Sequence, residues 1–249
     1  MTCFYWLRTI IFYIVFVLWT ALWCTWVMLT VYAVPVHSRQ TYSAATYGLV
    51  VAWMCRLICG IRWRIEGKEH IPDSPCVVAS NHQSTWETFY LQLLFTPQAT
   101  ITKKELLKIP VFGWAFRTLK PIAIDRGDPR RAMRQIHQQG MNALKNQYWV
   151  VIFPEGTRYN WPEIGRYTRG AATLAANVDV PILPIVHNAG CFWPNKKWLK
   201  KPGEIIMRIG PPINTKERSA KEINDELENW TKTNMLSASD TTGCASEET

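Results

Sequence analysis

Residues 75–87, PCVVASNHQSTWE, pass from a short apolar run through a polar turn into the first residues of a helix. The run from Pro75 to Ala79 has the length and composition of a buried strand. Ser84 is suited to cap the following helix, and Glu87 three residues later completes the capping-box pattern. A strand that leads directly into a helix is the repeating unit of α/β proteins, so this stretch predicts an α/β fold.

The same alternation continues on both sides of this stretch. Further strands are expected at residues 61–65, 99–102, 122–124, 148–153, 180–186 and 204–209. Further helices are expected at residues 103–108, 128–146, 170–176 and 220–230. Strands that alternate with helices predict a mixed, mainly parallel sheet flanked by helices. We place this domain at residues 61–235.

The first part of the chain has a different composition. From Thr9 to Val34 no residue is charged, and about 20 apolar residues suffice to span a bilayer as a helix. The apolar part of a signal peptide is shorter, about 7–15 residues, and a small-x-small cleavage site follows it. No clear site of that kind ends this run, so a membrane anchor is favoured over a cleaved signal peptide.

The sequence therefore divides into three parts: the membrane anchor and the segment after it at residues 1–60, the α/β domain at 61–235, and a tail at 236–249. Basic residues are more frequent after the apolar run than before it, which predicts that the domain at residues 61–235 lies on the cytoplasmic face of the membrane. Residues 41–60 mix apolar side chains with Arg56 and fit either a helix on the membrane surface or an ordinary packing helix. The tail, residues 236–249, is small, polar and acidic, and we expect it to be disordered.

The net charge limits the kinds of binding partner, and the cysteine spacing limits the kinds of disulfide or metal site. The formal net charge is +9 and the pI is near 9.3, which fits nucleic acid, anionic lipid or an acidic substrate. The anchor favours lipid, and no zinc-finger or RNA-recognition signature supports a nucleic-acid partner. The seven cysteines are scattered without paired CxxC spacing, which predicts free thiols in a reducing compartment and no metal site.

The turn at residues 80–87 carries a candidate catalytic pair. His82 lies at the junction of strand and helix, and Glu87 follows five positions later. A carboxylate bonded to one ring nitrogen fixes the tautomer and leaves the other nitrogen as a base for an alcohol. The alternative is that both residues only cap the helix.

Two further turns follow expected strands, where α/β proteins place ligand loops. Residues 153–158 read FPEGTR: Gly156 permits a tight turn, and Arg158 offers a fork for a phosphate. The alternative is a plain turn with a surface arginine. Arg126 follows the strand at 122–124 and either binds phosphate or pairs with a neighbour such as Asp125.

Taken together, these stretches resemble the glycerolipid acyltransferases, specifically the bacterial 1-acyl-glycerol-3-phosphate acyltransferases. Four blocks occur in the family's order, at residues 81–87, 122–126, 153–158 and 180–184. The resemblance covers about residues 60–210, and Glu87 stands where the family usually has Asp.

The resemblance implies a transfer of a fatty acyl group from acyl-CoA or acyl-carrier protein to the sn-2 hydroxyl of lysophosphatidic acid, which gives phosphatidic acid. It implies His82 and Glu87 as the catalytic pair, and no cofactor. The residues expected to bind substrate are Lys103, Lys104, Arg126, Glu155, Gly156, Thr157 and Arg158.

Several alternatives remain at this point. The acceptor could be glycerol-3-phosphate, an acylated amino-acid lipid or another lysophospholipid, and a lipid-binding homologue without activity would share the fold. A serine hydrolase is excluded because no G-x-S-x-G elbow occurs, and the nucleotide-binding P-loop and G-x-G-x-x-G patterns are absent from the sequence.

Overall fold

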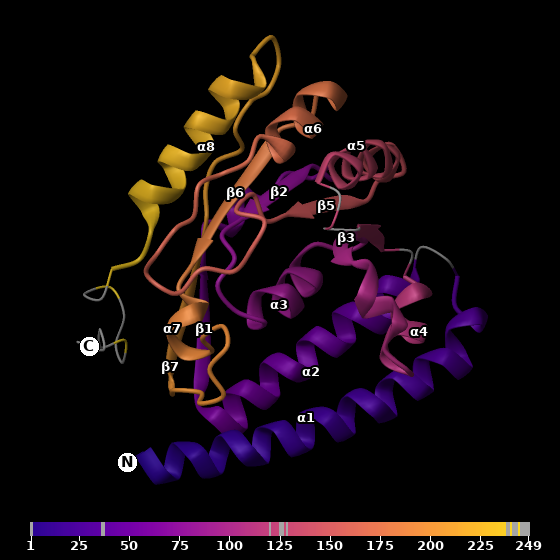
Figure 1. Ribbon diagram of the computed structural model, residues 1–249, viewed down its shortest axis with the longest axis vertical. Coiled ribbons are helices and arrows are strands. Elements are labelled where there is room, and N and C mark those ends of the chain that lie inside the picture. Colours follow the sequence, from indigo (N-terminus) through magenta and orange to yellow (C-terminus); the bar gives the residue numbers. More distant parts are fainter. Residues whose placement is uncertain are drawn as a thin grey trace.

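A computed structural model describes residues 2–35, 38–119, 121–124, 127, 129–237, 240 and 244. Its centre is one seven-stranded sheet in the order β1-β7-β6-β2-β5-β3-β4 (Figure 1). The strands are β1 (Ile61–Glu66), β2 (Val77–Ser80), β3 (Gln98–Lys103), β4 (Ile122–Ile124), β5 (Trp149–Ile152), β6 (Ile182–His187) and β7 (Gly203–Ile209). Each corresponds to a strand predicted from the sequence.

The direction of the strands brings several loops to one edge of the sheet. The neighbouring strands β6, β2, β5, β3 and β4 all run parallel. The pair β6–β7 is antiparallel, and β1 then runs parallel to β7. The predicted mixed, mainly parallel sheet is therefore confirmed, and five strands end at the same edge.

Helices cover both faces of the sheet (Figure 1). The α-helices are α1 (Thr2–Thr30), α2 (Thr46–Met54), α3 (Trp86–Leu94), α4 (Phe112–Arg117), α5 (Pro129–Lys145), α6 (Gly170–Val178), α7 (Ala189–Phe192) and α8 (Ala220–Asn234). The shorter helical turns are η1 (Val31–Ala33), η3 (Thr41–Ala45), η4 (Cys55–Cys59), η5 (Lys68–His70) and η6 (Lys104–Lys108). The sequence did not predict α4 and α7, which are too short to show helical periodicity.

Alternating residues of β2 divide the core into two layers. Val77 and Ala79 pack with Ala171 and Leu174 of α6, in the layer that also contains α5 and α8. Val78 points the other way and packs in the layer of α3, α2 and α1. A strand presents successive side chains to opposite faces, so a fully apolar strand needs cover on both sides.

The helix α1 lies along the base of the domain and is held there over most of its length (Figure 1). The Arg8 guanidinium donates to the backbone oxygen of Ile58 in η4. Further along, the Thr20 hydroxyl lies 2.7 Å from the Tyr47 hydroxyl. The Trp23 indole N–H donates to a backbone oxygen of η3 at 3.1 Å. These contacts set α1 against η3, α2 and η4.

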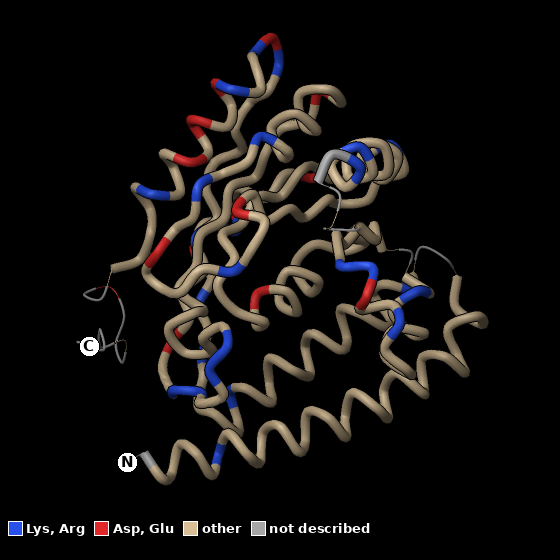
Figure 2. The backbone as a smooth tube through the Cα atoms, viewed as in Figure 1, with Lys and Arg blue, Asp and Glu red and all other residues tan. Residues whose placement is uncertain are grey.

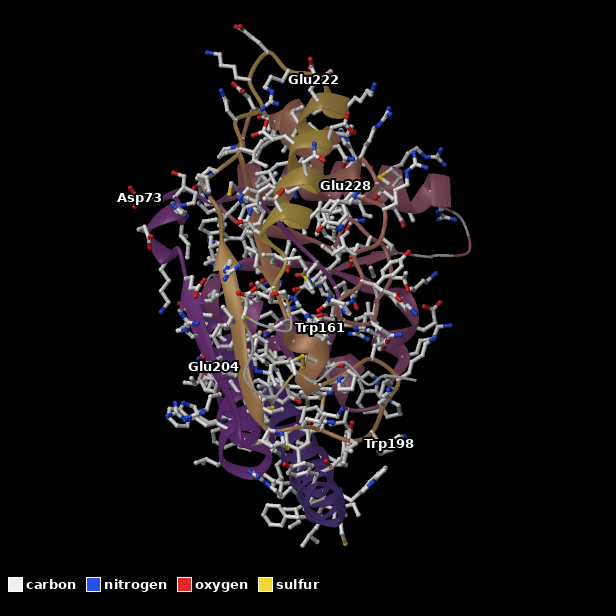
Figure 3. All side chains as sticks on the ribbon, turned by 90° about the vertical axis from the view of Figure 1, so that its left-hand side faces the viewer. Asp73, Trp161, Trp198, Glu204, Glu222 and Glu228 are labelled. Carbon is white, nitrogen blue, oxygen red and sulfur yellow. A yellow bond between two sulfur atoms is a disulfide. The ribbon has the colours of Figure 1, made fainter. Side chains whose placement is uncertain are left out.

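The outer side of this base is apolar. Large exposed apolar side chains come from α1, from α2 with η4, and from the η6–α4 region: Leu18, Leu22, Trp26, Leu29, Leu49, Trp53, Leu57, Leu106, Ile109 and Trp114. Figure 2 shows α1 and α2 almost without charged residues. In Figure 3, Trp198 lies at this lower end near α1, while Asp73 and Glu222 lie toward the other end. We name this surface the apolar base.

Two helical segments here, Cys3–Ala33 and Thr41–Cys59, are long and apolar enough to cross a membrane. In their most apolar stretches, 17% and 44% of the residues are buried inside the molecule. One side of the second segment packs on α3, as an ordinary packing helix would, and its other side carries exposed apolar residues of the apolar base. A position on the membrane surface stays a prediction for residues 41–60. Such a surface indicates membrane association.

The end of the chain shows one difference from the sequence analysis. Cys191 and Cys244 form a disulfide with their Cα atoms 5.9 Å apart, so the prediction of free thiols is wrong for this pair. The partners are 53 residues apart, and their spacing gave no signal. Leu236 and Cys244 are buried, although both belong to the tail expected to be disordered. The domain boundaries at 60 and 235 stay predictions.

Candidate active site

The candidate site lies at the edge where the parallel strands end. His82 follows β2 at the centre of the sheet, and the loop with Glu155 and Arg158 follows the neighbouring β5. Lys103 is the last residue of β3, and His187 is the last residue of β6. Four adjacent strands thus contribute side chains to one region, as is typical of ligand sites in α/β sheets.

The predicted catalytic pair is formed. The His82 Nδ1 and the Glu87 Oε1 lie 2.8 Å apart, and the Glu87 side chain is fully buried. The same oxygen accepts the backbone N–H groups of Gln83 at 3.1 Å and Ser84 at 2.9 Å. One carboxylate oxygen of Glu87 therefore contacts His82 and also binds the backbone just before α3, whose N-cap is Thr85 and not the predicted Ser84. The catalytic role of the pair stays a prediction.

The charge of Glu87 is well supported despite its burial. Burial acts to raise the pKa of the Glu87 carboxyl, but the hydrogen bond with His82 and the neighbouring donors outweigh burial and hold this pKa below its usual value. An ionised Glu87 accepts the Nδ1–H of His82, which leaves the lone pair of Nε2 free to take a proton.

The His82 ring is also fixed by packing. It stacks on Phe153, with 4.0 Å between ring centroids and 20° between ring planes. The backbone oxygen of His82 accepts the N–H of Tyr159 at 2.9 Å. A base held by a carboxylate, an aromatic ring and its own backbone has little freedom to turn, which favours proton transfer.

His82 lines a cavity of about 570 Å³. Polar side chains in its wall include Thr85, Thr157 and Arg158, and Arg158 is bonded to the turn that follows His82. The remainder is mostly apolar. Its wall comes from α1, α2, α3, η6, and α4 with the residues that follow it: Trp23, Val27, Tyr47, Phe89, Leu106, Phe112, Ala115, Phe116 and Leu119. Large apolar pockets with a few polar groups at one point are characteristic of ligand sites.

Arg158 lies beside the pair as predicted. Its Nε donates to the backbone oxygen of Ser84 at 2.9 Å, two residues after His82. Within the described part of the chain this is the one hydrogen bond of its guanidinium, so the two terminal nitrogens remain for a ligand. Lys103 and Thr157 also line the cavity.

The other predicted substrate-binding residues take different places. Lys104 begins η6 and does not line the cavity. Gly156 has a φ of +68° and its N–H donates to the Phe153 oxygen at 3.0 Å, so it forms the expected tight turn without lining the cavity. Arg126 lies outside the described residues.

Glu155 holds two loops together, and its assignment to substrate binding stays a prediction. One carboxylate oxygen accepts the backbone N–H of His82 at 2.7 Å, and the other accepts that of Gly165 at 2.9 Å. Burial, and then the charge of Glu87, raise the pKa of Glu155 to about 7, against the lowering effect of these two hydrogen bonds. With both oxygens engaged, Glu155 positions His82 and does not face the cavity.

The structure also adds residues that the sequence analysis missed. Asn195 and Lys196 line the cavity from the loop after α7, where no sequence motif pointed to them. His187 is completely buried beside the turn of His82. The sequence signal for His187 was the polar pair His187–Asn188 directly after the apolar run at residues 182–186.

Comparison with known proteins agrees with this geometry. Residues 62–188 match the Acyltransferase family model. The chain is 41% identical to a 1-acyl-sn-glycerol-3-phosphate acyltransferase of Pseudomonas aeruginosa, over 94% of this chain and 92% of the relative. It is 30% identical to the enzyme of that name from Saccharomyces cerevisiae, over 77% and 63% of the two chains.

A solved structure shows the same fold. It is the crystal structure of a 1-acyl-sn-glycerophosphate acyltransferase from Thermotoga maritima, with a TM-score of 0.78 and 24% identity. The match covers 92% of this chain and 93% of that one. From its family match, its relatives and its fold, the chain belongs to the acyltransferase family and is an acyl-transferring enzyme.

Proposed function

We propose that this enzyme transfers a fatty acyl group from an acyl thioester to the sn-2 hydroxyl of 1-acyl-glycerol-3-phosphate and so forms phosphatidic acid. The observation that carries this proposal is the His82–Glu87 pair at the polar end of an apolar cavity, with Arg158 beside it. The names of the curated relatives support the choice of lysophosphatidic acid over the other acceptors.

The pair supplies the base that the reaction needs. An alcohol does not lose its proton readily near neutral pH, so His82 takes the hydroxyl proton at Nε2 as the oxygen attacks the thioester carbonyl. The new C–O bond forms, the C–S bond breaks, and the sulfur leaves as a thiolate. The proton on His82 then passes to this thiolate or to water, which restores the neutral imidazole. Glu87 stabilises the imidazolium without taking the proton. No acyl-enzyme is needed for this direct transfer.

The developing oxyanion requires hydrogen-bond donors near His82. The backbone N–H groups of Gln83 and Ser84 already bind Glu87, so they are not available for it. Thr85 precedes α3 and lines the cavity next to His82. We assign the oxyanion contact to Thr85.

Arg158, with Lys103, is assigned to the acceptor phosphate. The bond from its Nε to the Ser84 oxygen orients the guanidinium, and two terminal nitrogens can then bind a phosphate as a fork. The anchoring carbonyl is only two residues from His82, so a phosphate bound by Arg158 would lie near the hydroxyl that reacts. The apolar part of the cavity is assigned to an acyl chain.

The apolar base is assigned to the cytoplasmic leaflet of the inner membrane. Contacts such as Thr20–Tyr47 hold α1 along the base of the domain, so α1 lies in the plane of one leaflet with the domain above it. The cavity is partly walled by Trp23 and Val27 of α1, which would give a lysolipid a short path from that leaflet.

The test uses the purified full-length protein in mixed lipid vesicles. Lysophosphatidic acid, glycerol-3-phosphate and lysophosphatidylcholine are each offered with acyl-CoA and with acyl-carrier protein as donor, and products are identified by mass. We expect phosphatidic acid as the main product with at least one donor. Product from lysophosphatidylcholine at a similar rate would contradict phosphate-monoester recognition, and no product from any acceptor would support a lipid-binding protein.

The role of Arg158 is tested in the same assay. Losing a charge-assisted bidentate contact costs roughly 1.5–3 kcal/mol, so Arg158→Ala should lower kcat/KM for lysophosphatidic acid by at least about tenfold. Arg158→Lys should recover little, because lysine lacks the fork. Lys104→Ala is the matched control, since Lys104 does not line the cavity, and it should change kcat/KM little.

A further inference from the structure

The end of β6 lies next to the turn that carries His82. Strands β2 and β6 are parallel neighbours, with Ser80 opposite Ile185. Asn81 and His187 follow these two positions and are both completely buried. His187 is the second histidine of this region, and the proposed reaction leaves it without a role.

Asn81 and His187 are joined by three hydrogen bonds. The Asn81 Oδ1 accepts the backbone N–H of His187 at 3.0 Å, and the Asn81 Nδ2 donates to the backbone oxygen of His187 at 2.9 Å. The His187 Nε2 lies 3.1 Å from the backbone oxygen of Asn81. The ends of β2 and β6 are therefore fixed to each other.

These contacts also determine the tautomer of His187. Its Nδ1 lies 3.2 Å from the backbone N of Ala189, which can only donate. The proton of a neutral ring is then on Nε2 and is donated to the Asn81 oxygen. Burial lowers the pKa of His187, against the raising effect of the charge of Glu87, so the ring remains neutral and does not compete with His82 for that carboxylate.

The peptide group between Asn81 and His82 is held on both sides as a result. Its oxygen accepts from His187 Nε2 at 3.1 Å, and its N–H donates to Glu155 Oε2 at 2.7 Å. The plane of this peptide sets the direction of the His82 side chain, because the Cα of His82 is one of its atoms. Rotation of the peptide would move the imidazole relative to Glu87 and to the cavity.

We propose that His187 is a positioning residue for acyl transfer: through the Asn81 oxygen it fixes the peptide that carries His82, opposite Glu155. This proposal rests on the proposed function only because that function names the reaction. The contacts of His187 and Glu155 fix the position of His82 whatever the substrate is. A displacement of about 1 Å at a catalytic group can cost about 10²-fold in rate, so loss of one such bond should be measurable.

Two substitutions separate the two contacts of the ring. In His187→Gln the terminal amide nitrogen reaches about as far as Nε2 and can still donate to the Asn81 oxygen. In His187→Asn the shorter amide can still accept from Ala189 but cannot reach Asn81. Asn188→Ala is the matched control, because Asn188 is equally buried but its Oδ1 binds the backbone N–H of Ile206 in β7.

We expect His187→Asn to lower kcat about 10- to 100-fold with the KM for lysophosphatidic acid changed less than about threefold. His187→Gln should retain kcat within about fivefold, and Asn188→Ala should lower the melting temperature with little change in kcat. A second readout is the NMR signal of the His82 Nδ1 proton, identified by its loss in His82→Ala. It should shift in His187→Asn and persist in His187→Gln and Asn188→Ala.

Normal kcat and an unshifted Nδ1 signal in His187→Asn would overturn the proposal. Equal loss of kcat in His187→Asn, His187→Gln and Asn188→Ala, in step with melting temperature, would overturn it too and leave His187 a purely structural role. If the wild type acylates no lysolipid, the proposed function fails, and the NMR comparison alone decides whether His187 positions His82.

Discussion

At the scale of single residues, the Oε1 of Glu87 receives three N–H donors, from His82 and from the backbone of Gln83 and Ser84. In the proposed mechanism, position 87 therefore needs a negative charge to stabilise the imidazolium of His82, and a side chain long enough to bind the backbone of the turn. Glutamate, which is one methylene longer than the aspartate usual at this position in the family, provides both the charge and the reach.

Substitutions at Glu87 separate charge from reach. Glu87→Gln retains the length but removes the charge that stabilises protonated His82, and we expect kcat to fall by about 10²-fold or more. Glu87→Asp retains the charge but draws the oxygen back from its donors, and its loss should be smaller than that of Glu87→Gln. His82→Ala should cost about 10²–10⁴ in kcat. Steady-state kinetics check this order, and a near-normal rate for His82→Ala would refute the pair.

The raised pKa of Glu155 predicts that, as the pH rises, folding stability falls while enzyme activity increases. Its pKa is raised from 4.5 to about 7 in the folded protein, so folding favours the protonated carboxyl. The stability from this group is complete below about pH 4.5 and is lost as the pH rises through about 7. Both backbone contacts require the ionised form, so the activity that depends on them should rise over the same pH range.

The measurement compares wild type with Glu155→Gln between pH 5 and 9, by melting temperature and by kcat. The variant should lose the part of each pH dependence that Glu155 contributes, and its kcat should be lower throughout because an amide leaves one N–H unpaired. Identical pH profiles for the two proteins would show that Glu155 does not titrate in this range.

Local contacts of the site were predictable from the sequence, and distant ones were not. His82 and Glu87 are five residues apart on one turn, so their meeting follows from strand and helix geometry alone. Glu155 binds the peptide of His82 across 73 residues, and His187 binds Asn81 across 106. Such contacts depend on which strands are neighbours, and a single sequence gives strand positions but not strand order.

At the scale of secondary-structure elements, the cavity is a joint product of helices far apart in the sequence. α1 supplies Trp23 and Val27, while α4 supplies Ala115 and Phe116. The apolar composition of α1 predicted a membrane helix, but its place against α4 did not follow from composition. α4 itself has only six residues and showed no usable periodicity.

A larger side chain on α4 should therefore change the acyl chain that the enzyme accepts. Ala115 is buried, lines the cavity and packs in the small cluster with Cys24 and Val27 of α1. We expect Ala115→Phe to fill part of the apolar end and to shift the preferred acyl length toward shorter chains. Competition between acyl thioesters of different lengths measures the shift. Ala115→Ser, with nearly the same volume, should leave the preference unchanged.

At the scale of the whole molecule, the apolar base and the cavity are built in part by the same elements. The base is built by α1, α2 with η4, and the η6–α4 region, and most of these elements also wall the cavity. An enzyme bound to one leaflet through the apolar base would take its lipid substrate directly from that leaflet, so the lipid would not have to pass through water. Contacts such as Arg8 with Ile58 and Thr20 with Tyr47 hold α1 against η4 and α2.

This arrangement predicts how the enzyme binds membranes. Leu18, Leu22 and Leu29 of α1 are all more than half exposed on the base. Burying a leucine side chain in apolar surroundings contributes about 1.5–3 kcal/mol, so replacing all three with glutamine should weaken vesicle binding by at least about 10²-fold. The same substitution at Met133 of α5, which is exposed but outside the base, should have little effect. Sedimentation with lipid vesicles measures both. If the triple variant still binds membranes fully, then α2 and the η6–α4 region anchor the enzyme without the outer face of α1. The control for folding is the acylation of a water-soluble short-chain lysolipid, which the triple variant should retain.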